Sequence, residues 1–284
     1  MKYINSLSSI IDSYDALILD LWGVVHDGTH LYPGILEVLR ELKAAGKKVI
    51  FLSNAPRRAH KVVAVLEQLG VGSALYQEAM SSGEMGYRWL AQELRWGPDY
   101  YYIGPSKDAD VVDGLEYKRL DDIKLADFLL NVGFGSEEQN SDDWMPLLRA
   151  AKGQSLPMLC LNPDLEVVKQ SGERFACAGE LAGRYAQLGG EVKWFGKPYP
   201  EVYDYCLHAL GTTKERVLAI GDSLHTDIQG AVDADIDCVL VTGGILKPQA
   251  HRIEELCREH QLAPDFIMPE LLWNMAGDKL EKAL

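Results

Sequence analysis

The sequence predicts an α/β fold built on a parallel sheet, and three observations lead to that prediction. Short apolar runs alternate with amphipathic helical stretches at both ends of the 284-residue chain. The runs are apolar throughout, as is typical of strands buried on both faces. Polar residues rich in carboxylates follow several of these runs directly, where open parallel sheets bind their ligands.

The first 80 residues alternate strand, helix, strand and helix. Residues 16–21 indicate a buried strand, and residues 34–45 carry an apolar stripe at helical spacing that Gly46 ends. A second buried strand over 49–52 leads to another helical stretch that ends at Gly70. Repeated strand–helix units of this kind predict parallel strands with right-handed crossovers.

The C-terminal part of the chain resumes this alternation. Its expected helices run from Pro200 to Gly211, through 228–232 and over 248–261, and its expected strands cover 217–220, 238–241 and 266–268. Because these strands are again apolar, we expect them to complete the sheet that the first 80 residues begin.

The middle of the chain has an α/β alternation of its own. Its strand-like runs lie at 101–104, 126–133 and 156–161, and its helical stretches lie around 82–95, 138–151 and 179–188. A block of about 110 residues is large enough to fold as a separate domain. We therefore expect residues 1–80 and 191–284 to form one domain and residues 81–190 an inserted one. The alternative is a single sheet of about eight or more strands.

Composition and charge exclude several kinds of partner. The net charge of −14 and the pI near 4.9 give an acidic surface, which repels nucleic acid and anionic membranes. No apolar run approaches the ~18 residues of a membrane span, and the N-terminus lacks the apolar core of a signal peptide. The 5 cysteines show no C-x-x-C spacing and fit reduced thiols. These features predict a cytoplasmic protein that binds neither nucleic acid nor membrane.

Polar side chains stand at the expected carboxyl ends of the first two strands. Asp20 closes the run at 16–21, and Ser53 and Asn54 follow the run at 49–52. Taken singly, Asp20 could be a turn residue, and Ser53 or Asn54 could be a helix N-cap. A hydroxyl beside backbone N–H groups also suits the oxygens of a phosphoryl group.

A second set of polar residues follows in the C-terminal part. Asp222 and Asp227 lie in the stretch GDSLHTD after the strand at 217–220, and Lys197 precedes the helix that leads to that strand. Because the carboxyl ends of parallel strands meet at one edge of a sheet, we expect these residues to gather around Asp20. Carboxylates suit Mg²⁺, an ammonium suits phosphoryl oxygens, and a carboxylate can itself attack phosphorus as a nucleophile.

As an ordered set, these residues resemble the four motifs of the haloacid dehalogenase (HAD) superfamily of hydrolases. The set consists of the strand ending at Asp20, an apolar run ending in Ser-Asn, Gly-Lys-Pro and Gly-Asp-x-x-x-Thr-Asp, within residues 16–245. The middle block, with SSGE at 81–84, LNPD at 161–164 and CAGEL at 177–181, is similar to the cap of the branch that contains p-nitrophenyl phosphatases and NagD-type nucleotide phosphatases. The resemblance implies a doubly wound, Rossmann-like core with an inserted α/β cap domain.

The resemblance also implies an activity and a metal site. The protein would be an Mg²⁺-dependent phosphatase of small phosphorylated metabolites such as sugar phosphates or nucleotides. Asp20 would attack phosphorus and form an aspartyl-phosphate. Asp20, Asp222 and the main-chain carbonyl of Trp22 would bind Mg²⁺, and Asp227 would support the metal through water or orient Lys197.

Further residues would bind the substrate if the resemblance holds. Ser53 and Asn54 would hold the phosphoryl oxygens, and Lys197 would neutralise charge between the nucleophile and the phosphate. A phosphate dianion can approach a carboxylate only when a divalent cation and an ammonium offset the repulsion. The loop residues Asn162 and Asp164 of the middle block are expected to influence which substrate is accepted.

Trp22 departs from the pattern, because most phosphatases of the resembled superfamily carry a second aspartate at this position. That aspartate protonates the leaving oxygen and then activates water, and an indole can do neither. Three explanations stay open. The substrate has a good leaving group; the protein is a weakly catalytic or non-catalytic phosphometabolite-binding protein; or another acid acts, with candidates at His26, Asp27, Asp164 and Glu180.

Overall fold

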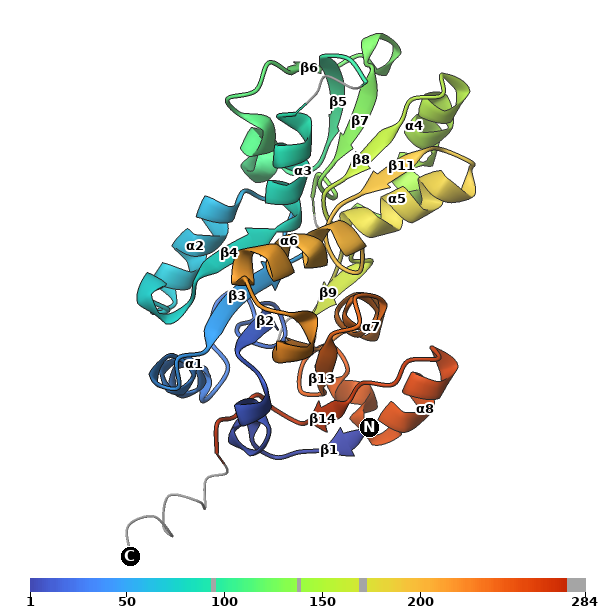
Figure 1. Ribbon diagram of the computed structural model, residues 1–284. Helices are drawn as coiled ribbons and strands as arrows, with labels where there is room; N and C mark the ends of the chain where they lie inside the picture. Colours follow the sequence, from blue (N-terminus) through green and yellow to red (C-terminus); the bar gives the residue numbers. More distant parts are fainter. Residues whose placement is uncertain (93–95, 137–138, 169–172, 275–284) are drawn as a thin grey trace, which may run out of the picture.

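The computed structural model describes residues 1–92, 96–136, 139–168 and 173–274 (Figure 1). Its strands form a seven-stranded sheet, a five-stranded sheet and a two-stranded hairpin. Each strand pairing within the two larger sheets is parallel. The predicted α/β class is therefore confirmed, and the alternative of one large sheet is wrong.

The seven-stranded sheet combines strands from both ends of the chain. In spatial order its strands are β1 (Lys2–Tyr3), β14 (Phe266–Met268), β13 (Asp237–Val241), β12 (Val217–Gly221), β2 (Ala16–Asp20), β3 (Lys48–Ser53) and β4 (Glu78–Ser81). Strand order runs one way from β2 to β4 and the other way from β12 to β14. The sheet therefore has its topological switch point between β2 and β12.

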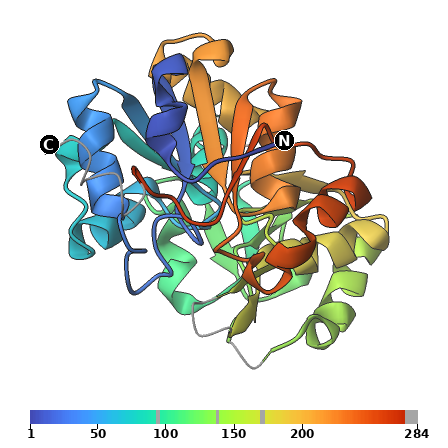
Figure 2. The ribbon, with the colours of Figure 1, turned by 90° about the horizontal axis from the view of Figure 1, so that it is seen from below.

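Helices cover both faces of this sheet, which gives the doubly wound core that the sequence implied. The helices are α1 (Ile35–Ala44), α2 (Ala59–Gln68), α6 (Pro200–Leu210), α7 (Gln229–Asp233) and α8 (Ile253–Glu259). Side chains alternate across β2, so that Leu17 and Leu19 pack with α1 and α2 while Ile18 packs with α6, α7 and α8. Figure 2 shows α1 and α8 on opposite sides of the sheet.

The middle of the chain forms the five-stranded sheet, drawn above the first one in Figure 1. Its strands, in spatial order, are β11 (Val192–Trp194), β8 (Met158–Cys160), β7 (Phe128–Asn131), β5 (Asp99–Ile103) and β6 (Lys118–Leu120). Its helices are α3 (Ser82–Leu90), α4 (Ser141–Gly153) and α5 (Ala178–Gln187). We refer to residues 82–194, from α3 through β11, as the insert, and to the seven-stranded sheet with its helices as the core.

The insert sheet extends beyond the predicted boundary at residue 190, because β11 pairs with β8. This strand has only three residues, one of them a lysine, so its sequence carries little strand signal. The division of the chain into two independently folding domains stays a prediction. A hairpin of β9 (Glu166–Val168) and β10 (Arg174–Ala176) follows β8 and extends toward the core in Figure 1.

Short helical turns complete the described chain. They are η1 (Leu7–Ser9), η2 (Ile11–Ser13), η3 (Ser73–Leu75), η4 (Ser106–Val112), η5 (Ile123–Leu125), η6 (Lys214–Arg216), η7 (Leu224–Ile228) and η8 (Lys247–Arg252). The helix expected through 228–232 begins with the π-helical turn η7, and the one expected over 248–261 starts as the 3₁₀ turn η8. The last residues of the helix expected over 82–95, residues 93–95, lie outside the described residues.

The general properties expected of the chain can be compared with the structure. The 5 cysteines are free and buried, in agreement with the expected reduced thiols. Within the described ranges, no helix combines the length and apolarity that crossing a membrane requires.

Candidate active site

The carboxyl ends of three core strands bring the predicted site residues together. Asp20 ends β2, Ser53 ends β3, and Asp222 directly follows β12. Since β2 pairs with both β3 and β12, these residues meet at the switch point of the sheet. The predicted gathering of polar residues at this edge is confirmed.

Asp20, Asp222 and Asp227 form a buried carboxylate cluster in which one ligand oxygen of each lies within 4.8 Å of the others. Burial raises the pKa of Asp20 well above its ordinary value, and the charges of the other two aspartates raise it further, while Lys197 lowers it. Burial and the charge of Asp227 raise the pKa of Asp222 to about 7. A bound cation would reduce this mutual repulsion, and the all-oxygen donor set of the cluster suits Mg²⁺.

Close backbone contacts hold Asp222 in the cluster. A Cβ atom added at Gly23 or at Gly244 would lie 1.9 Å from Asp222 Oδ2, so a side chain fits at neither position. The Ile245 N–H donates to the same oxygen at 2.7 Å. The loops after β2 and β13 thus close around this carboxylate. Sequence reasoning missed these three residues, although the glycines were a visible signal for a close backbone approach.

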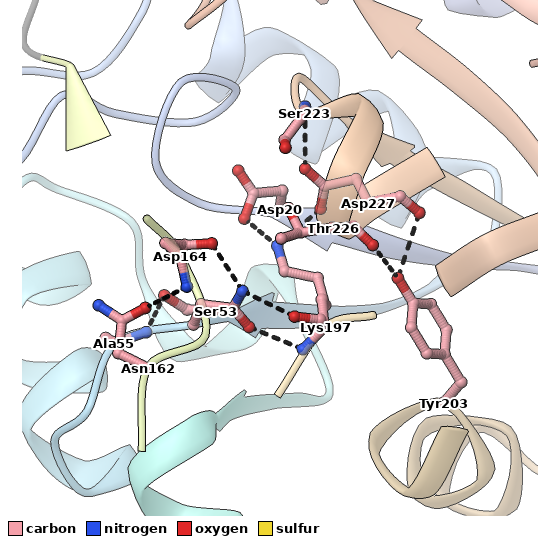
Figure 3. Close-up of polar contacts among 11 residues, drawn as sticks. Asp20, Ser53, Ala55, Asn162, Asp164, Lys197, Tyr203, Ser223, Thr226 and Asp227 are labelled. Carbon is pink, nitrogen blue, oxygen red and sulfur yellow. Dashed lines mark hydrogen bonds and ion pairs between the residues drawn. The ribbon is translucent and has the colours of Figure 1, made fainter. Parts of the chain in front are cut away.

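Lys197 supplies the positive charge of the site. It is 3% exposed, and its Nζ donates to Asp20 Oδ1 and, at 2.6 Å, to Asp227 Oδ1 (Figure 3). Burial alone would lower its pKa, but the adjacent carboxylates of Asp20 and Asp227 outweigh burial and hold the pKa well above its usual value. Lys197 is therefore a protonated ammonium between two carboxylates, as expected from its place in the sequence.

Asp227 uses both carboxylate oxygens within the site. Oδ1 accepts from Lys197, and Oδ2 accepts from the Ser223 N–H at 3.1 Å. The Tyr203 hydroxyl donates to the Asp227 main-chain carbonyl at 3.2 Å (Figure 3). Of the two roles expected for Asp227, these contacts favour orienting Lys197.

Ser53 and Asn54 lie beside Lys197 but make different contacts. The Ser53 hydroxyl accepts from the Ala55 N–H at 3.2 Å. The Asn54 amide bonds to the Lys197 main chain in both directions, accepting from its N–H at 2.7 Å and donating to its carbonyl at 3.1 Å. The helix N-cap alternative is wrong, because α2 begins only at Ala59. The predicted contact of both residues with phosphoryl oxygens stays a prediction.

Trp22 is packed into the turn that follows β2. Its ring lies against Gly28, where an added Cβ would come within 2.6 Å of the indole, and it meets His26 edge-on with ring centroids 6.1 Å apart. The Gly28 N–H donates to His26 Nδ1 at 2.9 Å. The indole therefore contributes to the shape of residues 22–28.

The candidates for a replacement acid differ in their surroundings. Burial raises the pKa of Asp27, but hydrogen bonds from the Thr29 and His30 N–H groups prevail and lower it. Burial lowers the pKa of His26 to about 4, so its imidazole is neutral at physiological pH. Glu180 lies in the first turn of α5, and within the described residues no hydrogen bond or ion pair joins its side chain to the core.

Asp164 is the insert residue that reaches the core site. Its Oδ1 accepts from Asn54 Nδ2 at 2.8 Å (Figure 3), and its N–H donates to Asn162 Oδ1 at 3.0 Å. Burial raises its pKa to about 6, although Lys197 and the hydrogen bond from Asn54 lower it. Both residues expected to influence substrate choice thus lie where the insert meets the core.

Comparisons with known proteins agree with this architecture. The family model described as haloacid dehalogenase-like hydrolase matches residues 17–118, and the one described as HAD-hydrolase-like matches residues 194–273. Chronophin from Bos taurus is 26% identical over 294 aligned positions, which cover 96% of each protein.

Solved structures extend the similarity to the whole described fold. A haloacid dehalogenase-like hydrolase from Brucella suis superposes with a TM-score of 0.85 and 29% identity, covering 95% of this chain and 100% of the other. The glycerol phosphate phosphatase Rv1692 from Mycobacterium tuberculosis, solved with magnesium, superposes with a TM-score of 0.65 at 22% identity, covering 83% and 70% respectively. The chain belongs to the haloacid dehalogenase-like hydrolase family, in the branch whose solved members include p-nitrophenyl phosphatases.

Proposed function

We propose that this protein is an Mg²⁺-dependent phosphatase of small phosphorylated metabolites, such as sugar phosphates or nucleotides, and that Asp20 is its nucleophile. One observation carries the proposal: Asp20 lies in a buried cluster with two further carboxylates and one lysine ammonium. An enzyme that transfers a phosphoryl group to a carboxylate needs this combination, because positive charge must offset the approach of two anions.

The residues present fit a magnesium ion. Asp20 and Asp222 would hold it together with the Trp22 carbonyl, and Asp227 would act through Lys197 or through water. The ion supplies charge neutralisation for the bound phosphate. The magnesium recorded in the related glycerol phosphate phosphatase is consistent with this choice of metal.

The chain's own groups have distinct tasks in the proposed reaction. The Ser53 hydroxyl and the neighbouring N–H groups bind phosphoryl oxygens, and Lys197 holds the Asp20 carboxylate in place. An Asp20 oxygen bonds to phosphorus while the bond from phosphorus to the leaving oxygen breaks. Water then attacks the aspartyl-phosphate, which releases inorganic phosphate and restores Asp20.

The insert favours small substrates. Two contacts join the insert to the core: Asp164 accepts from Asn54 within the site, and Lys61 of α2 pairs with Asp110 of η4 at 2.6 Å. An insert held against the core in this way leaves less room at the site for a macromolecular phosphate ester than for a small one. We therefore place small metabolites ahead of phosphoproteins as substrates.

Turnover of p-nitrophenyl phosphate with and without Mg²⁺ tests the proposal, and a panel of phosphometabolites then identifies the substrate class. Nitrophenolate leaves without a proton, so activity is expected despite Trp22. Asp20→Asn is expected to abolish it, whereas Asp12→Asn, at an exposed carboxylate, is expected to leave it unchanged. Turnover that is independent of both Mg²⁺ and Asp20 would contradict the proposal.

The second candidate, a weakly catalytic or non-catalytic phosphometabolite-binding protein, rests on Trp22. The indole cannot act as an acid or a base, and it is built into its turn by Gly28 and His26. Calorimetric titration with phosphometabolites that are bound but not hydrolysed would favour this candidate over the phosphatase.

A further inference from the structure

We propose that Asp164, which the insert carries into the site, is the general acid and base of the reaction at Asp20. This inference rests on the proposed phosphatase function. It selects Asp164 from the candidate acids His26, Asp27, Asp164 and Glu180, and adds this role to its expected influence on substrate choice.

The reaction needs a proton donor that the core does not offer. An alkoxide leaves phosphorus readily only if its oxygen is protonated, and the water of the second step must lose a proton. Within the described residues of the core site, Asp20 and Asp227 are paired with Lys197, and Asp222 is bound by Ile245 in the cluster suited to a cation. None of these groups is free to exchange a proton with the leaving group.

Asp164 is held firmly where it could perform this task. The Asn54 amide binds the Lys197 main chain with its oxygen and its nitrogen, and the same nitrogen donates to Asp164 Oδ1. Asn162 accepts from the Asp164 N–H, and the Asp164 carbonyl accepts from the Gly179 N–H at 3.1 Å. The core thus holds the carboxyl of Asp164, and the insert holds its main chain.

One oxygen of this carboxyl is available for chemistry. Oδ1 takes the hydrogen bond from Asn54, and Oδ2 has no hydrogen-bond partner in the described part of the chain. A proton on Oδ2 can therefore be transferred while Oδ1 keeps the group in position. Figure 3 draws the hydrogen bond on Oδ1 as a dashed line.

The charges around Asp164 support proton exchange near neutrality. Lys197, Asp222 and Asp227 face it from the core, and the thiols of Cys160 and Cys177 face it from the insert. Burial is the largest influence and raises the pKa to about 6, which is within the range where a carboxyl both gives and takes protons efficiently.

The proposed steps balance as follows. In the first, an Asp20 oxygen bonds to phosphorus, the bond to the leaving oxygen breaks, and the Asp164 proton moves to that oxygen to give an alcohol. In the second, the Asp164 carboxylate takes a proton from water while the water oxygen bonds to phosphorus and the bond to Asp20 breaks. The products are inorganic phosphate, ionised Asp20 and protonated Asp164.

Asp164→Asn tests this role, because the amide oxygen can still accept from Asn54 while the acid is lost. For a sugar phosphate, kcat is expected to fall by roughly 10²–10⁴-fold. For p-nitrophenyl phosphate, the first turnover is expected to stay fast, with a burst of nitrophenolate before a slow steady state, because only the second step loses its base. Glu180→Gln removes another carboxyl of the insert and is the control, because it is expected to leave the turnover of both substrates unchanged.

The wild-type enzyme gives a second readout that needs no variant. Sugar phosphate turnover should decline as pH rises above about 6, because the acid form of Asp164 is lost, whereas the nitrophenolate burst should lack this dependence. If Asp164→Asn lowered the turnover of both substrates by the same factor and showed no burst, Asp164 would have a structural role and the inference would be overturned. Failure of wild-type turnover or of the Asp20→Asn control would instead refute the phosphatase itself.

Discussion

The core and the insert contribute to the site in different ways. Core residues sit at the ends of strands in one rigid sheet, so Asp20 and Asp222 are placed by backbone pairing between β2 and β12. The insert contributes Asp164 from a loop after β8, and this residue reaches the site through a hydrogen bond to Asn54. In the proposed reaction, the core therefore supplies phosphoryl binding, whereas proton transfer depends on how the insert contacts the core.

The largest effect is expected from removing the core ammonium. Lys197→Met leaves Asp20 and Asp227 buried without their cation, which costs about 3–5 kcal/mol of folding free energy and abolishes turnover. Burial and the neighbouring carboxylates already raise the pKa of Asp20, and without Lys197 to lower it Asp20 binds its proton more tightly in the folded state than in the unfolded state. The stability of the variant is therefore expected to decrease as pH rises above about 4, the ordinary aspartate pKa.

Urea unfolding at pH 5 and pH 8 measures both expectations. Lys193→Met is the matched control at the edge of the insert, because its pair with Glu201 is 33% and 50% exposed and contributes about 0–1 kcal/mol. Equal stabilities of the Lys197 variant at the two pH values would mean that ionising the buried carboxylates does not destabilise the fold.

The next largest difference is expected between two glycine substitutions, one in the core at Gly23 and one in the insert at Gly183. Gly23→Ala places a Cβ 1.9 Å from Asp222 Oδ2 at a residue with φ +90°. We expect this variant to lose about 2–4 kcal/mol of its free energy of unfolding, and to lose its Mg²⁺-dependent activity as well. Gly183→Ala, within α5 of the insert and with open space around it, should be neutral or gain up to about 1 kcal/mol. Thermal unfolding of the two variants, followed with and without Mg²⁺, is the measurement, and similar losses in both would remove the distinction.

Trp22→Asp tests whether a carboxylate in the core can take over the acid role proposed for Asp164 of the insert. Removing a ring that packs on Gly28 and His26 should cost about 1–3 kcal/mol, less than for a fully buried ring. If Asp164 is already the acid, the ratio of sugar phosphate to p-nitrophenyl phosphate turnover should stay unchanged while both rates fall. A rise in this ratio would mean that the native site lacks an effective acid.

The same division explains how much the sequence could predict. Asp20 and Asp222 were predictable because they end or directly follow buried strands, and parallel strands align their carboxyl ends, whereas Asp227 was predicted from the stretch GDSLHTD that it shares with Asp222. The hydrogen bonds of Asn54 were not predictable, since they join residues 110 and 143 positions apart and depend on how the insert meets the core. Strand β11 was not predicted for a related reason. It is a strand because it pairs with β8, and its three residues alone carry little strand signal.

The smallest expected effect concerns the seating of the insert on the core. Lys61 and Asp110 pair across this boundary at 2.6 Å with side chains 29% and 41% exposed, so the pair contributes about 0.2–1 kcal/mol. If seating delivers Asp164, then Lys61→Met should lower kcat/KM for a sugar phosphate by up to about 5-fold and leave the nitrophenolate burst unchanged. Lys214→Met is the control. It breaks a comparable pair within the core, with Asp235 at 2.8 Å, and should leave the turnover of both substrates unchanged. A double-mutant cycle with Asp110→Asn isolates the pair. Equal losses for both substrates would show that the ion pair supports phosphate binding in general, and proton transfer would then not depend on how the insert is seated.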